Sequence, residues 1–118
     1  MRIVVIGNPI AKPRQTRMDV WKKRPCVMRY RDWADFCRAS AGRASKIHLT
    51  QPTCLIIKAF FDYGKTHRAG PHTQKPDFDN LSKACADALF HNDEMIWKSE
   101  VTKLWADGGQ PRVEIEWF

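Results

Sequence analysis

The sequence has no long hydrophobic run. None of its apolar stretches approaches the roughly 20 residues that a helix needs to cross a bilayer. The opening segment, residues 2–7, is also too short for the hydrophobic core of a signal peptide. We therefore expect no membrane helix and no membrane partner, and we predict a cytoplasmic protein.

The chain also lacks paired cysteines. Its four cysteines are spread singly along the sequence: Cys26, Cys37, Cys54 and Cys85. The disulfide framework of small secreted domains is therefore not expected, and reduced thiols that pack in the interior are predicted. A zinc site built from Cys54, Cys85, His67 and His72 is an alternative. Structural zinc generally uses closely spaced ligand pairs, which these cysteines do not offer.

Acidic residues are scarce in one part of the chain. The formal net charge is +7, and between Lys12 and Arg31 eight residues are basic while only Asp19 is acidic. The rest of the chain holds twelve basic and twelve acidic residues, so the excess charge forms a patch. Such a patch predicts an anionic partner, most often nucleic acid, and a solvated charged face is the alternative. The DNA-contacting residues predicted here are Lys12, Arg14, Arg17, Lys22, Lys23 and Arg24.

A second basic segment, residues 63–75, contains no acid at all. Its glycines and proline indicate a long loop, which is a common setting for functional residues. We predict that Lys65, Arg68 and Lys75 of this loop contact DNA. Three aromatic residues lie in or near the first patch and are candidates to stack on unpaired bases, although Trp33 fits a core position better: Trp21, Tyr30 and Trp33.

With 118 residues, the chain is long enough for one hydrophobic core, so residues 1–118 are predicted to form a single α+β domain. Periodicity predicts the order βαβαββ, a mixed sheet with two helices. Strands are expected at residues 3–6, 53–61, 96–105 and 112–117, the last two as a closing hairpin, and helices at about 30–46 and 77–90. Residues 8–27, with three prolines, are expected to form an irregular arm. The second helix should bury a stripe of apolar side chains: Phe78, Leu81, Cys85 and Leu89.

Carboxylates are concentrated where the second helix begins. Asp77 and Asp79 stand two residues apart after the basic loop, and Asp93 follows the helix, with Glu94 beside it. Converging carboxylates suit a hard divalent cation such as Mg²⁺ or Mn²⁺. A helix cap at Asp77 and a turn at Asp93 are the structural alternatives.

Lys83 lies four residues after Asp79 and therefore on the same side of the helix. Either it forms a surface ion pair with Asp79, or it stabilises the charge that develops on a phosphate. Asp87, one turn further on, is expected to be solvated or paired with Lys83 rather than to bind metal.

These residues resemble a known family. Lys75-Pro76-Asp77-x-Asp79-Asn80-Leu81-x-Lys83, followed by Asp87-Ala88-Leu89 and Asn92-Asp93, is similar to the central motif of the RusA family of Holliday junction resolvases, which occur in bacteria and their prophages. The opening Gly7-x-Pro9-x-x-Lys12-x-Arg14 is similar to the start of many family members.

The resemblance implies an endodeoxyribonuclease of DNA recombination and repair, with Asp77, Asp79 and Asp93 as catalytic and metal-binding acids and Lys83 as a catalytic lysine. It further implies a homodimer that uses Mg²⁺ or Mn²⁺ and no nucleotide cofactor, and that makes paired nicks across a four-way junction. The alternative is a non-catalytic module that binds branched or single-stranded DNA through the same basic surface. Such a module would have no need of the carboxylates.

Overall fold

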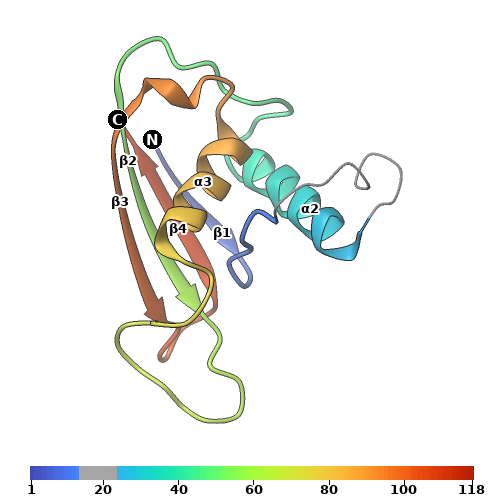
Figure 1. Ribbon diagram of the computed structural model, residues 1–118, viewed down its shortest axis with the longest axis vertical. Helices are drawn as coiled ribbons and strands as arrows, with labels where there is room; N and C mark the ends of the chain where they lie inside the picture. Colours follow the sequence, from blue (N-terminus) through green and yellow to red (C-terminus); the bar gives the residue numbers. More distant parts are fainter. Residues whose placement is uncertain (14–23) are drawn as a thin grey trace.

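The computed structural model describes residues 1–13 and 24–118 of the chain. A four-stranded sheet is covered on one face by two helices (Figure 1). The elements in chain order are β1 (Arg2–Ile6), α2 (Pro25–Ser40), β2 (Thr53–Phe61), α3 (Phe78–Leu89), the short 3₁₀ helix η1 (Asp93–Met95), β3 (Ile96–Trp105) and β4 (Arg112–Trp117). The predicted α+β class and the order βαβαββ are confirmed.

The sheet has the order β1-β4-β2-β3. Strand β2 pairs in parallel with β3 on one side and antiparallel with β4 on the other, so the predicted hairpin between the last two strands is wrong. Strand β2 is the most deeply buried strand, and the central position gives it neighbours on both sides. The middle of β3 is exposed and polar, which suits a sheet edge. The parallel pairing requires a crossover between β2 and β3, and α3 lies within it.

Helix α2 begins earlier and ends earlier than predicted. Pro25 occupies its first turn, where proline has no hydrogen bond to lose, so the end of the predicted irregular arm is helical. The helix ends at Ser40, and two residues later Gly42 has a φ of 70°, which is energetically costly for residues other than glycine. The backbone N–H of Gly42 donates to Ala39 and that of Arg43 donates to Arg38, which is the Schellman arrangement of a helix end. Asp35 pairs with Arg38.

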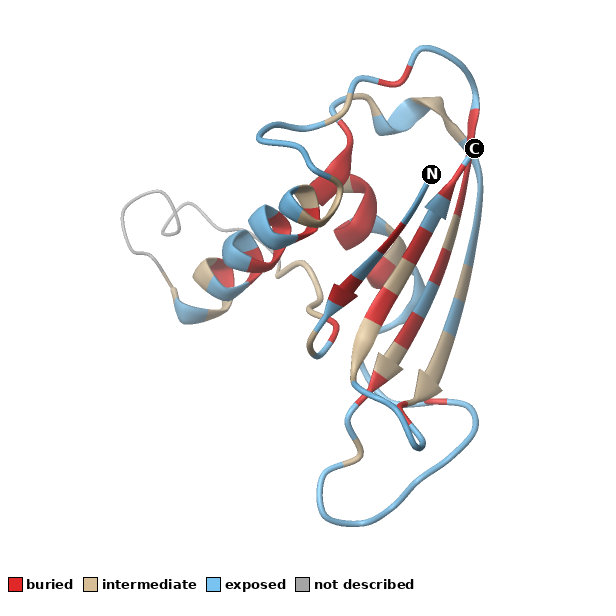
Figure 2. Cartoon of the chain, turned by 180° about the vertical axis from the view of Figure 1, so that it is seen from behind, coloured by how far each residue is buried: buried red, intermediate tan, exposed pale blue. Residues whose placement is uncertain are grey.

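The core lies between the helices and one face of the sheet. Buried and exposed side chains alternate along β1 and β4, and each helix buries the side that faces the sheet (Figure 2). Tyr30 and Trp33 are buried in this core, so neither is available to stack on DNA. Trp21 lies outside the described residues. In the described part of the chain, no helix is long and apolar enough to cross a membrane.

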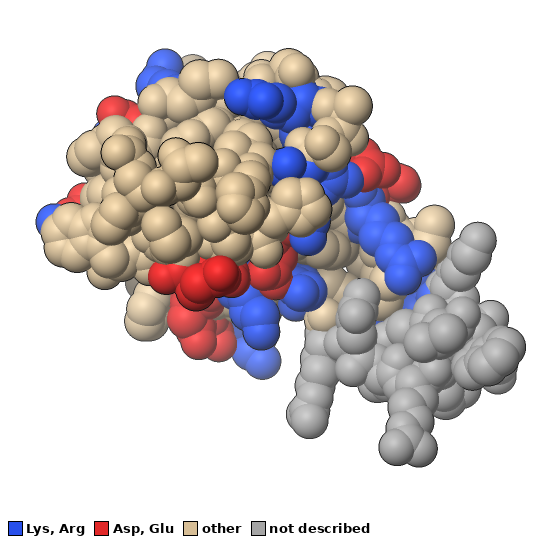
Figure 3. Space-filling view, turned by 90° about the horizontal axis from the view of Figure 1, so that it is seen from above, with Lys and Arg blue, Asp and Glu red and all other residues tan. Residues whose placement is uncertain are grey.

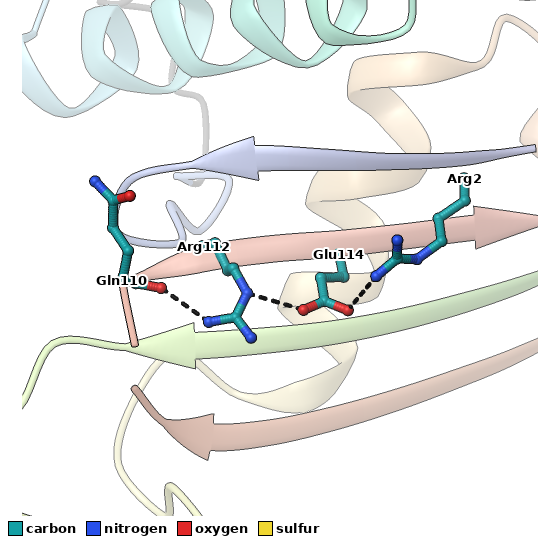
Figure 4. A network of polar contacts seen from close by, with 4 residues as sticks. All are labelled: Arg2, Gln110, Arg112 and Glu114. Carbon is teal, nitrogen blue, oxygen red and sulfur yellow. Dashed lines mark hydrogen bonds and ion pairs between the residues drawn. The ribbon is translucent and has the colours of Figure 1, made fainter. Parts of the chain in front are cut away.

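The opposite face of the sheet is covered by neither helix. There the carboxylate of Glu114 accepts hydrogen bonds from Arg2 and Arg112, each at 2.8 Å (Figure 4). The Arg112 guanidinium also lies 3.8 Å from the centre of the Phe60 ring. Burial by itself would raise the pKa of Glu114, but the hydrogen bonds from Arg112 and Arg2 outweigh it and lower the pKa. On this face Glu114 is therefore held between two arginines of the same chain.

The two helices are joined by a buried hydrogen bond, which gives a test of their packing. The Tyr30 hydroxyl on α2 donates to the carbonyl of Ala84 on α3 at 2.9 Å. We expect Tyr30→Phe to lower the free energy of unfolding by about 1 kcal/mol in urea denaturation, because one net hydrogen bond is lost while the ring still fills its space. Phe36→Leu, on the exposed side of α2, should change it by less than about 0.5 kcal/mol. Equal effects of the two substitutions would contradict this role for Tyr30.

Candidate active site

The aspartate motif is held where α3 begins. Leu81, Cys85 and Leu89 are fully buried and fix the helix against the sheet. Asp77 stands at the N-cap position, yet its carboxylate makes no capping hydrogen bond, and only its backbone carbonyl accepts from the N–H of Leu81 at 3.1 Å. The structural alternative for Asp77, a simple helix cap, therefore does not describe its side chain.

Two adjoining pockets open around this helix end. The first, of about 430 Å³, lies between α3 and β3; its lining includes Asp79, Ser82, Lys83, Asp93 and Ser99. The second, of about 500 Å³, lies between the helix start and the loop before it; its lining includes His72, Lys75, Asp77, Asp79 and Lys103. Phe78 and Asp79 line both pockets, so the two pockets adjoin at the motif.

Lys83 shares the first pocket with Asp79 but forms no ion pair with it. Among the described residues, neither side chain makes a hydrogen bond or ion pair. The predicted surface pair is therefore absent there, and both charged groups face the pocket without a partner. Asp87, one turn beyond Lys83, instead accepts from the Lys12 ammonium at 2.6 Å. The expectation that Asp87 is solvated or paired with Lys83 is wrong, because the chain before residue 14 lies against α3.

Asp93 lines the same pocket from its other end. It opens η1, which lies beyond the last turn of α3, whereas Asp77 stands at the N-cap of α3 and Asp79 lies in its first turn (Figure 1). The pocket follows α3 from Asp79 to Ala86, a rise of about 10 Å, and is therefore a groove. Glu94 is not among its lining residues. Within the described part of the chain, no three His, Cys, Asp or Glu side chains are grouped to hold a metal ion, which applies to the aspartates and to the zinc alternative alike.

The loop before the motif is attached to the edge of β3. The N–H of His72 donates to the carbonyl of Lys103, and the N–H of Trp105 donates to that of Gly70, each at 3.0 Å. The His72 ring is buried and stacks on Phe61 at 3.8 Å between ring centres, with Trp105 against it edge-on at 4.5 Å. Its Nδ1 has no hydrogen-bond partner within residues 1–13 and 24–118. His72 thus fixes the position of the loop that leads to Asp77.

Several basic residues predicted to contact DNA have partners within the chain. Lys12 is paired with Asp87, and the Arg68 guanidinium lies 5.1 Å from the centre of the Trp105 ring. Arg24 also has a partner in the structure. Lys65 and Lys75 are exposed, and Lys75 lines the second pocket. The remaining predicted contacts lie outside the described residues: Arg14, Arg17, Lys22 and Lys23. DNA contact by all of these residues stays a prediction.

Seen from above, many of the Lys and Arg side chains lie on the α2 side of the molecule, and others lie beside Asp and Glu side chains elsewhere on the surface (Figure 3). The described part of the basic patch contributes to this side through α2, where Arg29 and Arg31 are exposed. Lys and Arg are thus frequent on this side, but the two signs of charge are not fully separated on the visible face.

Phe78 is not in the environment that the sequence predicted. Phe78 was expected on the buried stripe of α3, but 67% of its surface is exposed. It is the first residue of α3 and borders the two pockets instead of the core, so helical spacing alone does not bury it. The only sequence signal was its position between Asp77 and Asp79.

Unpaired carboxylates and a lysine along one groove of a small basic domain are the residue types used by nucleases that hydrolyse phosphodiesters. The family model described as endodeoxyribonuclease RusA matches residues 6–117, almost the whole chain. The chain therefore belongs to the RusA endodeoxyribonuclease family, as the motif indicated, and it is a nuclease by family. A search of curated proteins gave no match.

The buried histidine gives a prediction on stability. Burial, together with the positive charge of Lys103, lowers the pKa of His72. Because the unfolded chain then takes up this proton more readily than the folded chain, the free energy of unfolding should fall as the pH drops below the ordinary histidine pKa of about 6.5. His72→Phe keeps a stacking ring and removes the titration. We expect wild type to lose stability relative to His72→Phe between pH 7.5 and 5, as measured by urea denaturation. A difference that is independent of pH would contradict it.

Proposed function

We propose that the protein is a metal-dependent endodeoxyribonuclease that resolves Holliday junctions by paired symmetric nicks, in DNA recombination and repair. The observation that carries this proposal is the groove between α3 and β3, where Asp79 and Lys83 lie without partners among the described residues. Membership of the RusA family supplies the substrate class, branched DNA.

The cofactor in this proposal is Mg²⁺ or Mn²⁺, held by Asp77 and Asp79 with Asp93 as the third acidic ligand. Carboxylate oxygens are the donors that a hard cation prefers, and these three exposed carboxylates make no hydrogen bond or ion pair among the described residues. Within the described residues the three carboxylates are not grouped around one point, and Asp93 lies at the other end of the groove. Mg²⁺ commonly uses one or two carboxylates and completes its shell with water and substrate phosphate, so Asp77 and Asp79, which line one pocket, are the pair that would hold it in the single chain. When bound, the ion supplies Lewis-acid stabilisation and a nucleophilic water at neutral pH.

The lysines around the two pockets have distinct proposed roles. Lys83, inside the groove beside Asp79, stabilises the charge that develops on the cleaved phosphate. Lys75, in the adjoining pocket, holds a neighbouring phosphate of the same strand, with Lys65 and Arg68 further along the loop. Such contacts position the DNA without reading its sequence.

A homodimer completes the proposal. A four-way junction has two-fold symmetry, and two copies of the chain related by a two-fold axis present two equivalent sites to it. Each site cuts one of two opposed strands, which yields two nicked duplexes.

The decisive test is cleavage of a synthetic four-way junction by wild type and Asp79→Asn. We expect wild type to nick two opposed strands with Mg²⁺ and to be inactive with EDTA. Asp79→Asn should lower the rate by roughly a hundredfold or more while it still binds the junction, because it loses a metal ligand and little DNA contact. Asp77→Asn and Asp93→Asn should behave in the same way.

Glu100→Gln is the matched control for this test. Glu100 lies on β3 one residue after the groove residue Ser99, but it is absent from the groove lining, and we expect wild-type activity. If Asp79→Asn cuts as fast as wild type, the catalytic assignment is wrong. If wild type binds the junction and does not cut it with Mg²⁺ or Mn²⁺, the chain is a branched-DNA binding module.

Lys83→Met tests the catalytic lysine. We expect kcat for junction cleavage to fall by roughly a hundred- to a thousandfold with KM changed little, because the ammonium acts on charge that develops in the transition state. Lys98→Met removes an exposed lysine of β3 that lines neither pocket and should leave kcat unchanged. A rise in KM at constant kcat for Lys83→Met would reduce Lys83 to a DNA-binding residue.

A further inference from the structure

Phe78 is the most unusual apolar residue of the site. It lies between the two aspartates of the motif, 67% of its surface is exposed, and it lines both pockets. A large exposed aromatic ring contributes less hydrophobic stabilisation than a buried one. The core does not require an aromatic residue at position 78. Leu81, Cys85 and Leu89 already supply the buried side of α3.

The surroundings of the ring are charged and polar. Lys83 lies in the groove on one side, and Lys75 and Lys103 line the pocket on the other. The Lys103 ammonium donates to the carbonyl of Gln74 at 2.6 Å, whereas Lys75 and Lys83 make no ion pair among the described residues. An aromatic face flanked by free ammonium groups matches the two parts of a nucleotide, the base and the phosphate.

We propose that Phe78 is a base-stacking residue that receives an unpaired nucleobase at the branch point of the DNA, and so places the adjoining phosphodiester at Asp79. This inference rests on the proposed function, and it adds the residue that distinguishes branched from fully paired DNA. In a continuous duplex the bases are stacked on each other, so Phe78 has no base face to contact. At a branch point a base is released more easily, and stacking on the ring compensates for its lost neighbour.

Other exposed aromatic residues provide the contrast. Phe36 on the outer side of α2 is 48% exposed and lines none of the pockets near the motif. Substitution of Phe36 therefore reports what the loss of any exposed aromatic ring does to folding and to non-specific DNA binding. Tyr30 and Trp33, the aromatic residues that the sequence suggested for stacking, are buried and cannot fill this role.

The test compares Phe78→Ala, Phe78→Leu and Phe78→Trp in binding to a four-way junction and to a duplex of the same sequence. Ca²⁺ replaces Mg²⁺, so that binding is measured without cleavage. We expect Phe78→Ala and Phe78→Leu to bind the junction roughly five- to a hundredfold more weakly, the range measured for loss of one base-aromatic stack. Duplex affinity should be unchanged. Phe78→Trp should keep the junction affinity of wild type, and Phe36→Ala should match wild type on both DNAs.

The outcomes distinguish base stacking by Phe78 from a role in the folding of the protein and from a role in DNA cleavage. Wild-type junction affinity of Phe78→Leu would overturn the proposal, because leucine is apolar and of similar size but has no ring. Equal losses on junction and duplex, or a lower thermal unfolding temperature for Phe78→Leu, would also overturn it. Junction preference that disappears in Phe78→Ala and returns in Phe78→Trp supports it, even if Mg²⁺ then produces no cleavage. An absence of cleavage with Mg²⁺ would reject only the proposed nuclease function, and the stacking role of Phe78 would stand.

Discussion

The contact on which the site depends is the burial of one side of α3 against the sheet. Leu81, Cys85 and Leu89 are inaccessible to solvent, and the burial raises the pKa of the Cys85 thiol well above its usual range. Because successive turns of the helix are fixed in this way, the start of α3 has a single orientation. Asp79 and Lys83, one turn apart, are then both directed into the groove beside β3.

The order of the strands provides the other wall of that groove. Strand β2 is largely buried and has a neighbour on each side; β3 pairs with it in parallel and is the edge strand beside α3. The parallel pairing sends the chain from the end of β2 through the basic loop and α3 before it returns along β3. Loop, helix start and β3 edge thus meet at one place, where His72 stacks between Phe61 and Trp105.

Asp79 and Lys83 in the groove have no partner among the described residues, whereas several other charged side chains of the molecule are paired. Asp87 holds Lys12, Glu114 holds Arg2 and Arg112, and Asp107 holds His67. Carboxylates and ammonium groups that stay unpaired contribute less to the stability of the fold than the same groups would in ion pairs. A surface that leaves them available is suited to binding a cation and an anionic backbone together.

The pattern of amino acids alone was enough to establish which segments are helices or strands and to recognise the motif. Periodicity located β2, α3 and β4 closely, because buried side chains repeat at a fixed spacing in each. The relative positions of Asp77, Asp79 and Lys83 follow from their place at the start of α3. Tertiary structure decided which strands are neighbours, that Lys12 pairs with Asp87, that Asp93 lies at the far end of the groove, and that Phe78 is exposed. The physical reason is that local spacing fixes the direction of a side chain on its own element, whereas its surroundings depend on where the neighbouring elements end.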